Sequence, residues 1–211
     1  EADSFELMHL LNDPAFCDSL SLTPENVLVL FIPNTYNYYW NTSAAKLMER
    51  TLKEYRKFWN DERMLKLGEL KMTQAEAGIL AAIVQKETYR KDEMPVVAGA
   101  YLNRIKTGMP LQADPTLIYA MNDNSIKRVG GAMLTIESPY NTYKYKGLPP
   151  GPICVPSAAA IDAVLNYSKH NYIYFCAKED FSGYHNFASS FAQHQVNARK
   201  YQRELNRRGV K

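Results

Sequence analysis

The stretch "GILAAIVQKETYR", residues 78–90, combines an apolar helical surface with a single carboxylate. Small and branched apolar residues fill its first half, and no proline interrupts it. Counted back from Glu87 in helical steps, Ile83, Ile79 and Ala75 fall on one line. The pattern therefore predicts a helix that carries Glu87 on its apolar stripe.

Two interpretations of Glu87 stay open from this periodicity alone. The carboxylate either anchors the fold, for example through a salt bridge to Arg90 or Arg104, or it has a chemical task. Partial burial disfavours the charged form of a carboxyl group and raises its pKa, as a general acid near neutral pH requires. Glu87 is therefore the first candidate catalytic residue.

The composition is that of a globular protein with one substantial domain, or one domain with a small companion. The chain has 211 residues, of which 46% are hydrophobic and 22% are charged. A net charge of +3 is too small to indicate a nucleic-acid partner. No apolar run in the sequence has the length needed to cross a bilayer.

The cysteines and histidines do not form a metal-site pattern. Cys17, Cys154 and Cys176 are widely spaced and include no C-x-x-C motif. Taken alone, three unpaired cysteines favour a reducing compartment. The four histidines lack the short spacings of zinc ligands. We expect no metal and no cofactor.

Helices dominate the predicted secondary structure. A helical piece at residues 4–20 precedes a short strand within residues 26–33, and a long amphipathic helix begins after Thr42 or Ser43. Thr73 and Glu76 have the spacing of a capping box. Further helices are predicted within residues 94–108, where Gly108 ends the helix, and within residues 111–121 and 157–168.

The strands and loops of the second half complete the predicted fold. Residues 171–178 read as a strand, and residues 183–187 as a turn into a second strand or a helix start. Prolines and glycines make residues 134–157 irregular, and loops of that length are usually functional. The predicted class is α+β, a helix-rich domain with short strands and long ordered loops.

Polar and aromatic groups near these loops are the candidate ligand contacts. Asp114 before Pro115 is either the cap of a helix or a ligand contact. The side chains of the loop "SPYNTY" either contact a ligand or make turn-forming hydrogen bonds. His194 lies close to the apolar stripe of the terminal helix, which favours a core histidine over a ligand contact. The full set of candidate contacts is Gln112, Asp114, Tyr140, Asn141, Thr142, Tyr143, His185 and His194.

Four segments resemble those of one family in their order along the chain and in most of their residues. They are "LAAIVQKET", "VAGAYLNRIKTGMPLQADPTLIYAM", "SPYNTYKYKGLPPGPICVPS" and "YIYFCAKEDFSGYHNFASSFAQH". The chain resembles the YceG-like (MltG) family, the endolytic murein transglycosylases, over roughly residues 31–200. The resemblance implies a catalytic domain at residues 31–211. Residues 1–30 resemble only the end of the family's small LysM-like subdomain, truncated here.

The resemblance also implies a substrate, a location and partners. The substrate would be nascent peptidoglycan glycan strands, cleaved internally, with peptidoglycan synthases (penicillin-binding proteins) as further candidate partners. The location would be the periplasmic face of the inner membrane. An N-terminal transmembrane anchor, absent from this chain, would hold the enzyme there. The scattered cysteines disagree with this location, and the four-segment resemblance outweighs them.

The family's catalytic glutamate falls in the segment that contains Glu87. Family members often carry Glu-Lys-Glu there, whereas this chain has Gln85, so Glu87 is the only carboxylate of the segment. The resemblance implies that Glu87 acts as an acid and then as a base, and closes a 1,6-anhydro ring on N-acetylmuramic acid. From the apolar stripe and the loops rich in Tyr, Asn and Pro, we expect the helix that carries Glu87 to form the floor of an open groove. The alternatives are a hydrolytic muramidase that uses Asp114 or Glu137, and a non-catalytic peptidoglycan-binding scaffold module.

Overall fold

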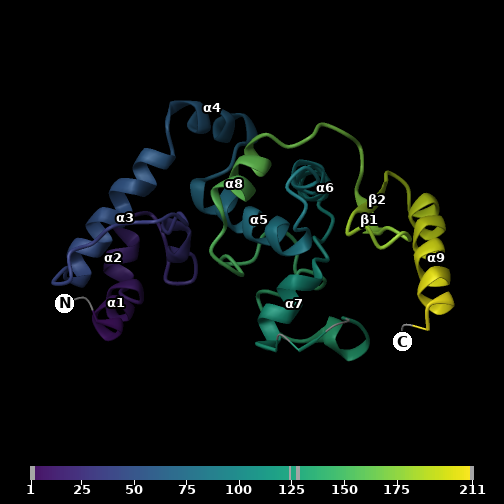
Figure 1. The fold of residues 1–211 in the computed structure, drawn as a ribbon, viewed down its shortest axis with the longest axis horizontal. Helices are drawn as coiled ribbons and strands as arrows, with labels where there is room; N and C mark the ends of the chain where they lie inside the picture. The colour runs from purple at the N-terminus through teal and green to yellow at the C-terminus, as the bar shows by residue number, and fades with distance from the viewer. Residues whose placement is uncertain (1–2, 124, 127–128, 210–211) are drawn as a thin grey trace. The chain divides into compact units, whose positions relative to one another are not determined.

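The computed structural model describes residues 3–123, 125–126 and 129–209 (Figure 1). The chain divides into two compact units, unit 1 with residues Glu1–Ile83 and Leu148–Leu165, and unit 2 with residues Val84–Gly147 and Asn166–Lys211. This division differs from the domain boundary predicted at residues 30/31, which stays a prediction. The separation between the units falls inside the helix that ends at Glu87.

Unit 1 is built from helices. Its elements are α1 (Ser4–Leu11), α2 (Pro14–Asp18), the 3₁₀-helix η1 (Val27–Leu30), α3 (Ala44–Phe58), α4 (Asp61–Leu70), the first part of α5 (Gln74–Glu87) and α8 (Ala158–Leu165). Helix α1 packs against α2 and α3, and α4 packs against α8 (Figure 1). The Arg63 guanidinium of α4 forms an ion pair with Asp162 of α8 at 2.8 Å.

Three local predictions for unit 1 are corrected by side-chain capping and by burial. The predicted strand within residues 26–33 is η1, which buries Val27, Val29 and Leu30 without a strand partner. The helical piece at residues 4–20 breaks into α1 and α2 because the Asp13 side chain caps α2. In the same way, Asn60 accepts a hydrogen bond from the Arg63 amide and begins α4, which divides the long predicted helix.

Unit 2 carries the only sheet of the described residues. Its elements after α5 are α6 (Met94–Lys106), α7 (Asp114–Met121), the 3₁₀-helix η2 (Gly131–Thr135), β1 (Tyr174–Ala177), β2 (His185–Ala188) and α9 (Phe191–Arg207). Strands β1 and β2 pair antiparallel, from Tyr174 opposite Ala188 to Ala177 opposite His185. Helix α9 packs on both strands (Figure 1). The helix-rich α+β prediction is confirmed.

Close packing around α6 explains why small residues occupy its centre. Val97, Ala98, Ala100 and Tyr101 are fully buried. A Cβ built at Gly99 would lie 2.4 Å from the Ser168 carbonyl oxygen, so only glycine fits there without a shift of the backbone. Helix α6 therefore lies close to the backbone at Ser168.

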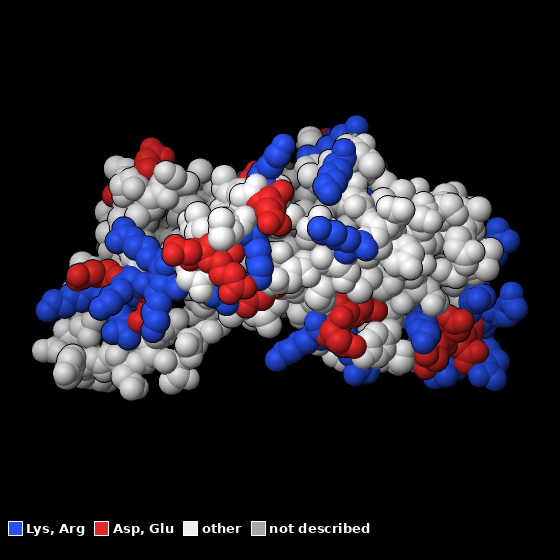
Figure 2. All heavy atoms as spheres, turned by 90° about the horizontal axis from the view of Figure 1, so that it is seen from above, with Lys and Arg blue, Asp and Glu red and all other residues white. Residues whose placement is uncertain are grey.

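Surface charge is mixed in sign. On the face shown in Figure 2, groups of Lys and Arg lie next to groups of Asp and Glu. On α9, Glu204 forms ion pairs with Arg207 and Arg208 at 2.7 and 2.8 Å, so part of the basic C-terminal segment is locally neutralised. Among the residues that the structure describes, no helix is long and apolar enough to cross a membrane.

Candidate active site around Glu87

Glu87 is the last residue of α5, a helix that begins with the predicted capping box. The Glu76 amide donates to Thr73 Oγ1 at 3.1 Å, and the Glu76 carboxylate accepts from the Thr73 amide at 2.7 Å. At the other end, Glu87 Oε2 accepts a hydrogen bond from the Tyr101 hydroxyl at 3.1 Å. Tyr101 is fully buried and Glu87 is partly buried. A rigid helix and a fixed donor thus hold the carboxyl group in place.

Desolvation dominates the electrostatics of this carboxyl group. Burial raises the pKa of Glu87 to about 7, although the Tyr101 hydrogen bond and the charges of His185 and Arg104 oppose the change. The negative charge of Asp114 acts in the same direction as burial. A carboxyl group with a pKa near neutrality can both donate and accept a proton at physiological pH.

Among the residues that the structure describes, neither Arg90 nor Arg104 forms a salt bridge with Glu87. Arg104 donates to the carbonyls of Leu111 and Ile173, the second at 2.6 Å. Arg90 donates to the Ser182 carbonyl at 2.5 Å. Both guanidinium groups are therefore directed to backbone oxygens, and the hydrogen-bond partner of Glu87 is a tyrosine. A structural ion pair does not account for the position of this carboxylate.

A pocket of about 270 Å³ includes Glu87 in its wall. Mostly aromatic and polar residues line it, from the end of α5 and the two residues after it, the β1–β2 hairpin and α9. They are Glu87, Thr88, Tyr89, Ala177, Lys178, Phe181, Gly183, Tyr184, His185 and Tyr201. Aromatic faces next to polar groups suit sugar rings, which present both apolar and hydroxyl surfaces. The pocket is therefore chemically suited to a carbohydrate next to an acid.

Gly183 shapes one wall of this pocket. Its φ of +80° lies in the left-handed region that glycine adopts at no steric cost. A Cβ at this position would lie 1.9 Å from the Tyr89 hydroxyl oxygen. The Tyr89 side chain, which is 71% exposed, can lie over the turn only because residue 183 has no side chain.

His185, a predicted contact, lines the same pocket and is held by a carboxylate that sequence reasoning missed. Glu93 accepts from the His185 amide at 2.7 Å, and its other oxygen lies 2.7 Å from His185 Nδ1. Burial alone would raise the pKa of Glu93, but hydrogen bonds from His185 and Thr88 hold it below the usual value. Glu93 therefore stays ionised beside the Glu87 pocket.

Asp114 is not the cap of its helix, which corrects one of its two sequence interpretations. The N-cap of α7 is Ala113, and Asp114 is the first helical residue. Its carboxylate accepts a hydrogen bond from the Tyr143 hydroxyl. Burial and Asp114 together raise the pKa of Tyr143, so the phenol stays protonated as the donor. Asp114 and Tyr143 thus form a pair whose negative charge acts on Glu87.

Asn141 and Thr142 are buried with their polar atoms bonded inside the protein. Asn141 donates to the carbonyls of Leu134 and Ile136 and accepts from two following amides. Thr142 Oγ1 accepts from the Ala113 amide at 3.0 Å. The hydrogen bonds of Asn141 are the turn-forming ones that the sequence left as an alternative, whereas Thr142 joins this loop to the residue before α7. The contacts of both side chains with a ligand stay predictions.

Gln112, Tyr140 and His194 occupy three other settings. Gln112 is exposed and has a left-handed φ of +49°. Its backbone N–H donates to the Thr142 carbonyl at 3.0 Å. Tyr140 packs against Tyr119 with ring centroids 4.8 Å apart. His194 stacks on Tyr174 at 5.3 Å, and burial lowers its pKa. None of the three lines the pocket that contains Glu87, so their roles as ligand contacts stay predictions.

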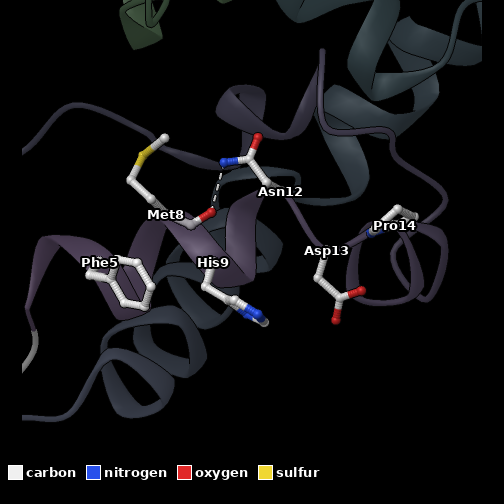
Figure 3. A pocket seen from close by; sticks show the side chains of 6 residues that line it. All are labelled: Phe5, Met8, His9, Asn12, Asp13 and Pro14. Atoms are coloured by element: carbon white, nitrogen blue, oxygen red, sulfur yellow. Dashed lines mark hydrogen bonds between the residues drawn. The ribbon is translucent and has the colours of Figure 1, made fainter.

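A second pocket, of about 410 Å³, belongs to unit 1 and is shown in Figure 3. Phe5, Met8, His9, Asn12, Asp13 and Pro14 line it. Asn12 Nδ2 donates to the Met8 carbonyl at 2.7 Å, and Asp13 is occupied as the cap of α2. Asn12 and Asp13 thus form hydrogen bonds with the backbone at the ends of α1 and α2. Among the described residues, no group of three or more His, Cys, Asp or Glu side chains forms a metal site.

Glu93 and Tyr101 are the neighbours of Glu87 and His185 that sequence reasoning missed, whereas Arg104 was considered only as an ion-pair partner of Glu87. Tyr101 and Arg104 are three residues apart and therefore share one face of α6. The sequence shows this spacing, but it does not show that the Tyr101 hydroxyl reaches Glu87. Glu93 lies 92 residues from His185, and no local pattern joins them.

The sequence of this chain is similar to one known family. The family model described as "YceG-like family" matches residues 4–200. An "Endolytic murein transglycosylase" of Bacillus subtilis is 38% identical over 122 residues, which are 58% of this chain and 33% of that protein. The protein of the same name from Streptococcus pneumoniae is 34% identical over 110 residues, 50% of this chain and 20% of that protein.

A solved structure extends the comparison to three dimensions. The crystal structure of a yceG-like protein from Listeria monocytogenes matches with a TM-score of 0.75 and 27% identity, over 92% of this chain and 67% of that one. The chain spans about a third or less of the length of the curated relatives that it matches. Because the family model covers nearly the whole chain, this protein belongs to the YceG-like family.

Proposed function

We propose that unit 2 carries a lytic transglycosylase site that cleaves peptidoglycan glycan strands internally, with Glu87 as the catalytic residue. The observation that carries the proposal is a pocket-lining carboxyl group whose pKa is raised to about 7 and whose hydrogen-bond partner is a neutral phenol. Relatives that are 34–38% identical over 110–122 residues carry the name endolytic murein transglycosylase, which supports the substrate class.

In the proposed reaction Glu87 transfers a proton twice. The protonated carboxyl group donates to the glycosidic oxygen as the bond from C1 of N-acetylmuramic acid to N-acetylglucosamine breaks. The muramyl 6-hydroxyl oxygen then bonds to C1, and its proton passes to the Glu87 carboxylate. The products are an N-acetylglucosamine end and a 1,6-anhydro ring. Tyr101 stabilises the carboxylate between the two transfers, because its hydroxyl donates to Glu87 Oε2.

One carboxylate is sufficient for this chemistry because the nucleophile belongs to the substrate. Glycoside hydrolysis usually needs a second carboxylate, to activate water or to form a covalent intermediate. The other acids weighed for that role are already engaged: Asp114 accepts from Tyr143, and Glu137 accepts from Lys144 and Tyr145. These contacts favour the intramolecular reaction over hydrolysis.

Product analysis tests the proposal. Uncrosslinked glycan strands are incubated with the protein, with Glu87→Gln, and with Glu69→Gln, which changes an exposed glutamate of α4 as a matched control. We expect 1,6-anhydro ends, one water lighter than reducing ends, from the wild type and the control. Loss of the proton donor should lower the rate by about 10²–10⁴-fold or more in Glu87→Gln. Reducing ends would instead identify a hydrolase, and binding without cleavage a scaffold module.

The location and partners follow from the same proposal. We place the enzyme at the periplasmic face of the inner membrane, where nascent strands emerge, with an N-terminal anchor as its tether. Peptidoglycan synthases are the proposed protein partners because they produce the uncrosslinked strand that this reaction would consume.

A further inference from the structure

The pair formed by Glu93 and His185 is buried and geometrically fixed. The Glu93 side chain is 5% exposed and that of His185 is 14% exposed. Glu93 accepts from the His185 amide and is paired with His185 Nδ1, each at 2.7 Å. It also accepts from Thr88, the residue that follows Glu87. The carboxylate thus joins the end of α5 to the start of β2.

The neighbouring residues strengthen this connection. The Tyr184 hydroxyl donates to Asp92 at 2.9 Å. The two residues before α6, Asp92 and Glu93, thus bind Tyr184 and the first residue of β2, His185. The His185 ring also meets the Phe175 ring edge-on, with centroids 5.5 Å apart. The imidazole therefore has little freedom to rotate.

These contacts decide which ring nitrogen carries the proton. An ionised carboxylate can only accept hydrogen bonds, so Nδ1 must carry a hydrogen to approach Glu93 at 2.7 Å. In a neutral imidazole the other nitrogen then has a free lone pair. Nε2 has no hydrogen-bond partner among the residues that the structure describes, and the ring lines the pocket that contains Glu87.

We propose that Glu93 is a positioning residue that keeps a hydrogen on His185 Nδ1, so that Nε2 of the neutral form of the ring accepts a hydrogen bond from an amide N–H of the sugar beside Glu87. The role toward a sugar rests on the proposed function, whereas the tautomer does not. No bond is made or broken by His185 in this proposal. It orients the sugar ring relative to the carboxyl group of Glu87.

Glu93→Gln is a volume-conserving test of the tautomer. The His185 amide can only donate, so it requires the oxygen of the new side chain. The amide NH₂ is then directed to Nδ1, where it can only donate. Nδ1 must give up its hydrogen, and the neutral ring changes to the Nε2–H tautomer, with a donor in place of an acceptor in the pocket.

Nitrogen NMR of protein labelled with ¹⁵N-histidine measures the tautomer directly at a pH where the ring is neutral. The signals of His185 are assigned from their loss in His185→Asn. We expect a protonated Nδ1 in the wild type, the reverse in Glu93→Gln, and no change in Asp92→Asn, a control at the adjacent residue. An Nε2–H tautomer in the wild type would overturn the proposal. Because this measurement needs no variant, the proposal can be refuted even if Glu93→Gln does not fold.

The rate of anhydro-end formation tests the role toward the sugar. Exchange of an acceptor for a donor should lower kcat/KM about tenfold, equivalent to one hydrogen bond to the substrate, and Glu93→Asp should recover part of the loss. An active Glu93→Gln with unchanged kcat/KM and a reversed tautomer would refute the contact with the sugar. Absence of anhydro ends from the wild type would refute the proposed function instead, and the tautomer result would stand.

Discussion

Replacing Glu87 by Gln should stabilise unit 2, and the gain should depend on pH. Burial raises the pKa of Glu87 from 4.5 to about 7. Each pKa unit corresponds to about 1.4 kcal/mol between the two protonation states, so the folded protein holds the ionised carboxylate at a cost of up to about 3 kcal/mol. Gln keeps an oxygen that can accept from Tyr101 and never ionises.

The sign follows from the two protonation states. Below pH 4.5 the carboxyl group is protonated in both the folded and the unfolded chain, and it costs nothing. Between pH 4.5 and 7 the unfolded chain releases the proton and the folded one retains it, so stability is lost as the pH rises. Above pH 7 the full penalty is present. The advantage of Glu87→Gln should therefore be close to zero at pH 4 and reach about 1–3 kcal/mol at pH 8.

The assay must report on unit 2 alone. Trp40 and Trp59 both belong to unit 1, so tryptophan fluorescence would follow the wrong unit. Hydrogen exchange of the buried α6 amides, measured at several pH values and compared with Glu69→Gln, reports the opening free energy of unit 2. A gain that is the same at pH 4 and pH 8 would contradict the raised pKa. A loss of stability in Glu87→Gln would show that the carboxylate anchors the fold.

Three further predictions concern the neighbours of Glu87 and the packing of α6. Tyr101→Phe removes the hydrogen bond that favours the carboxylate, so the alkaline limb of the kcat/KM profile should move up by about one pH unit, and an unmoved limb would exclude Tyr101 as a partner. Asp114→Asn removes the charge that raises the pKa of Glu87, so the same limb should move to lower pH. Gly99→Ala places a Cβ against the Ser168 carbonyl and should cost about 1–3 kcal/mol in thermal unfolding, without moving the limb.

The sequence predicted those elements whose signals are local. The capping box at Thr73 and Glu76 begins α5, and Gly108 follows α6 with a φ of +64° in the left-handed conformation predicted for it. Ser43 caps α3, as one of two expected positions. Each of these depends on hydrogen bonds between residues only three or four apart, which a sequence pattern can show directly.

The errors and omissions have a different physical origin. Asp114 precedes a proline, as helix-capping residues often do, but its carboxylate accepts a hydrogen bond from the Tyr143 hydroxyl, 29 residues away. Asn141 is fully buried and bonded to the backbone of its own loop, and its contact with a ligand stays a prediction. Glu93 meets His185 only after the hairpin has folded against α6. Tertiary contacts decide the positions of Asp114 and Glu93, and a single sequence does not contain them. The hydrogen bonds of Asn141 are local, and they are the alternative that the sequence had left open.

The placement of Arg104 explains how Glu87 can keep a pKa near neutrality. A guanidinium in direct contact with a carboxylate would favour its charged form strongly and leave no proton to donate. Arg104 is buried, but its donors are used by the carbonyls of Leu111 and Ile173, so its charge acts on Glu87 without an ion pair. The positive charge of Arg104 therefore opposes the rise in the pKa of Glu87 that burial causes, but does not cancel it. Redirecting one of these donors to Glu87 would lower the pKa of the carboxyl group and remove the acid on which the proposed reaction depends.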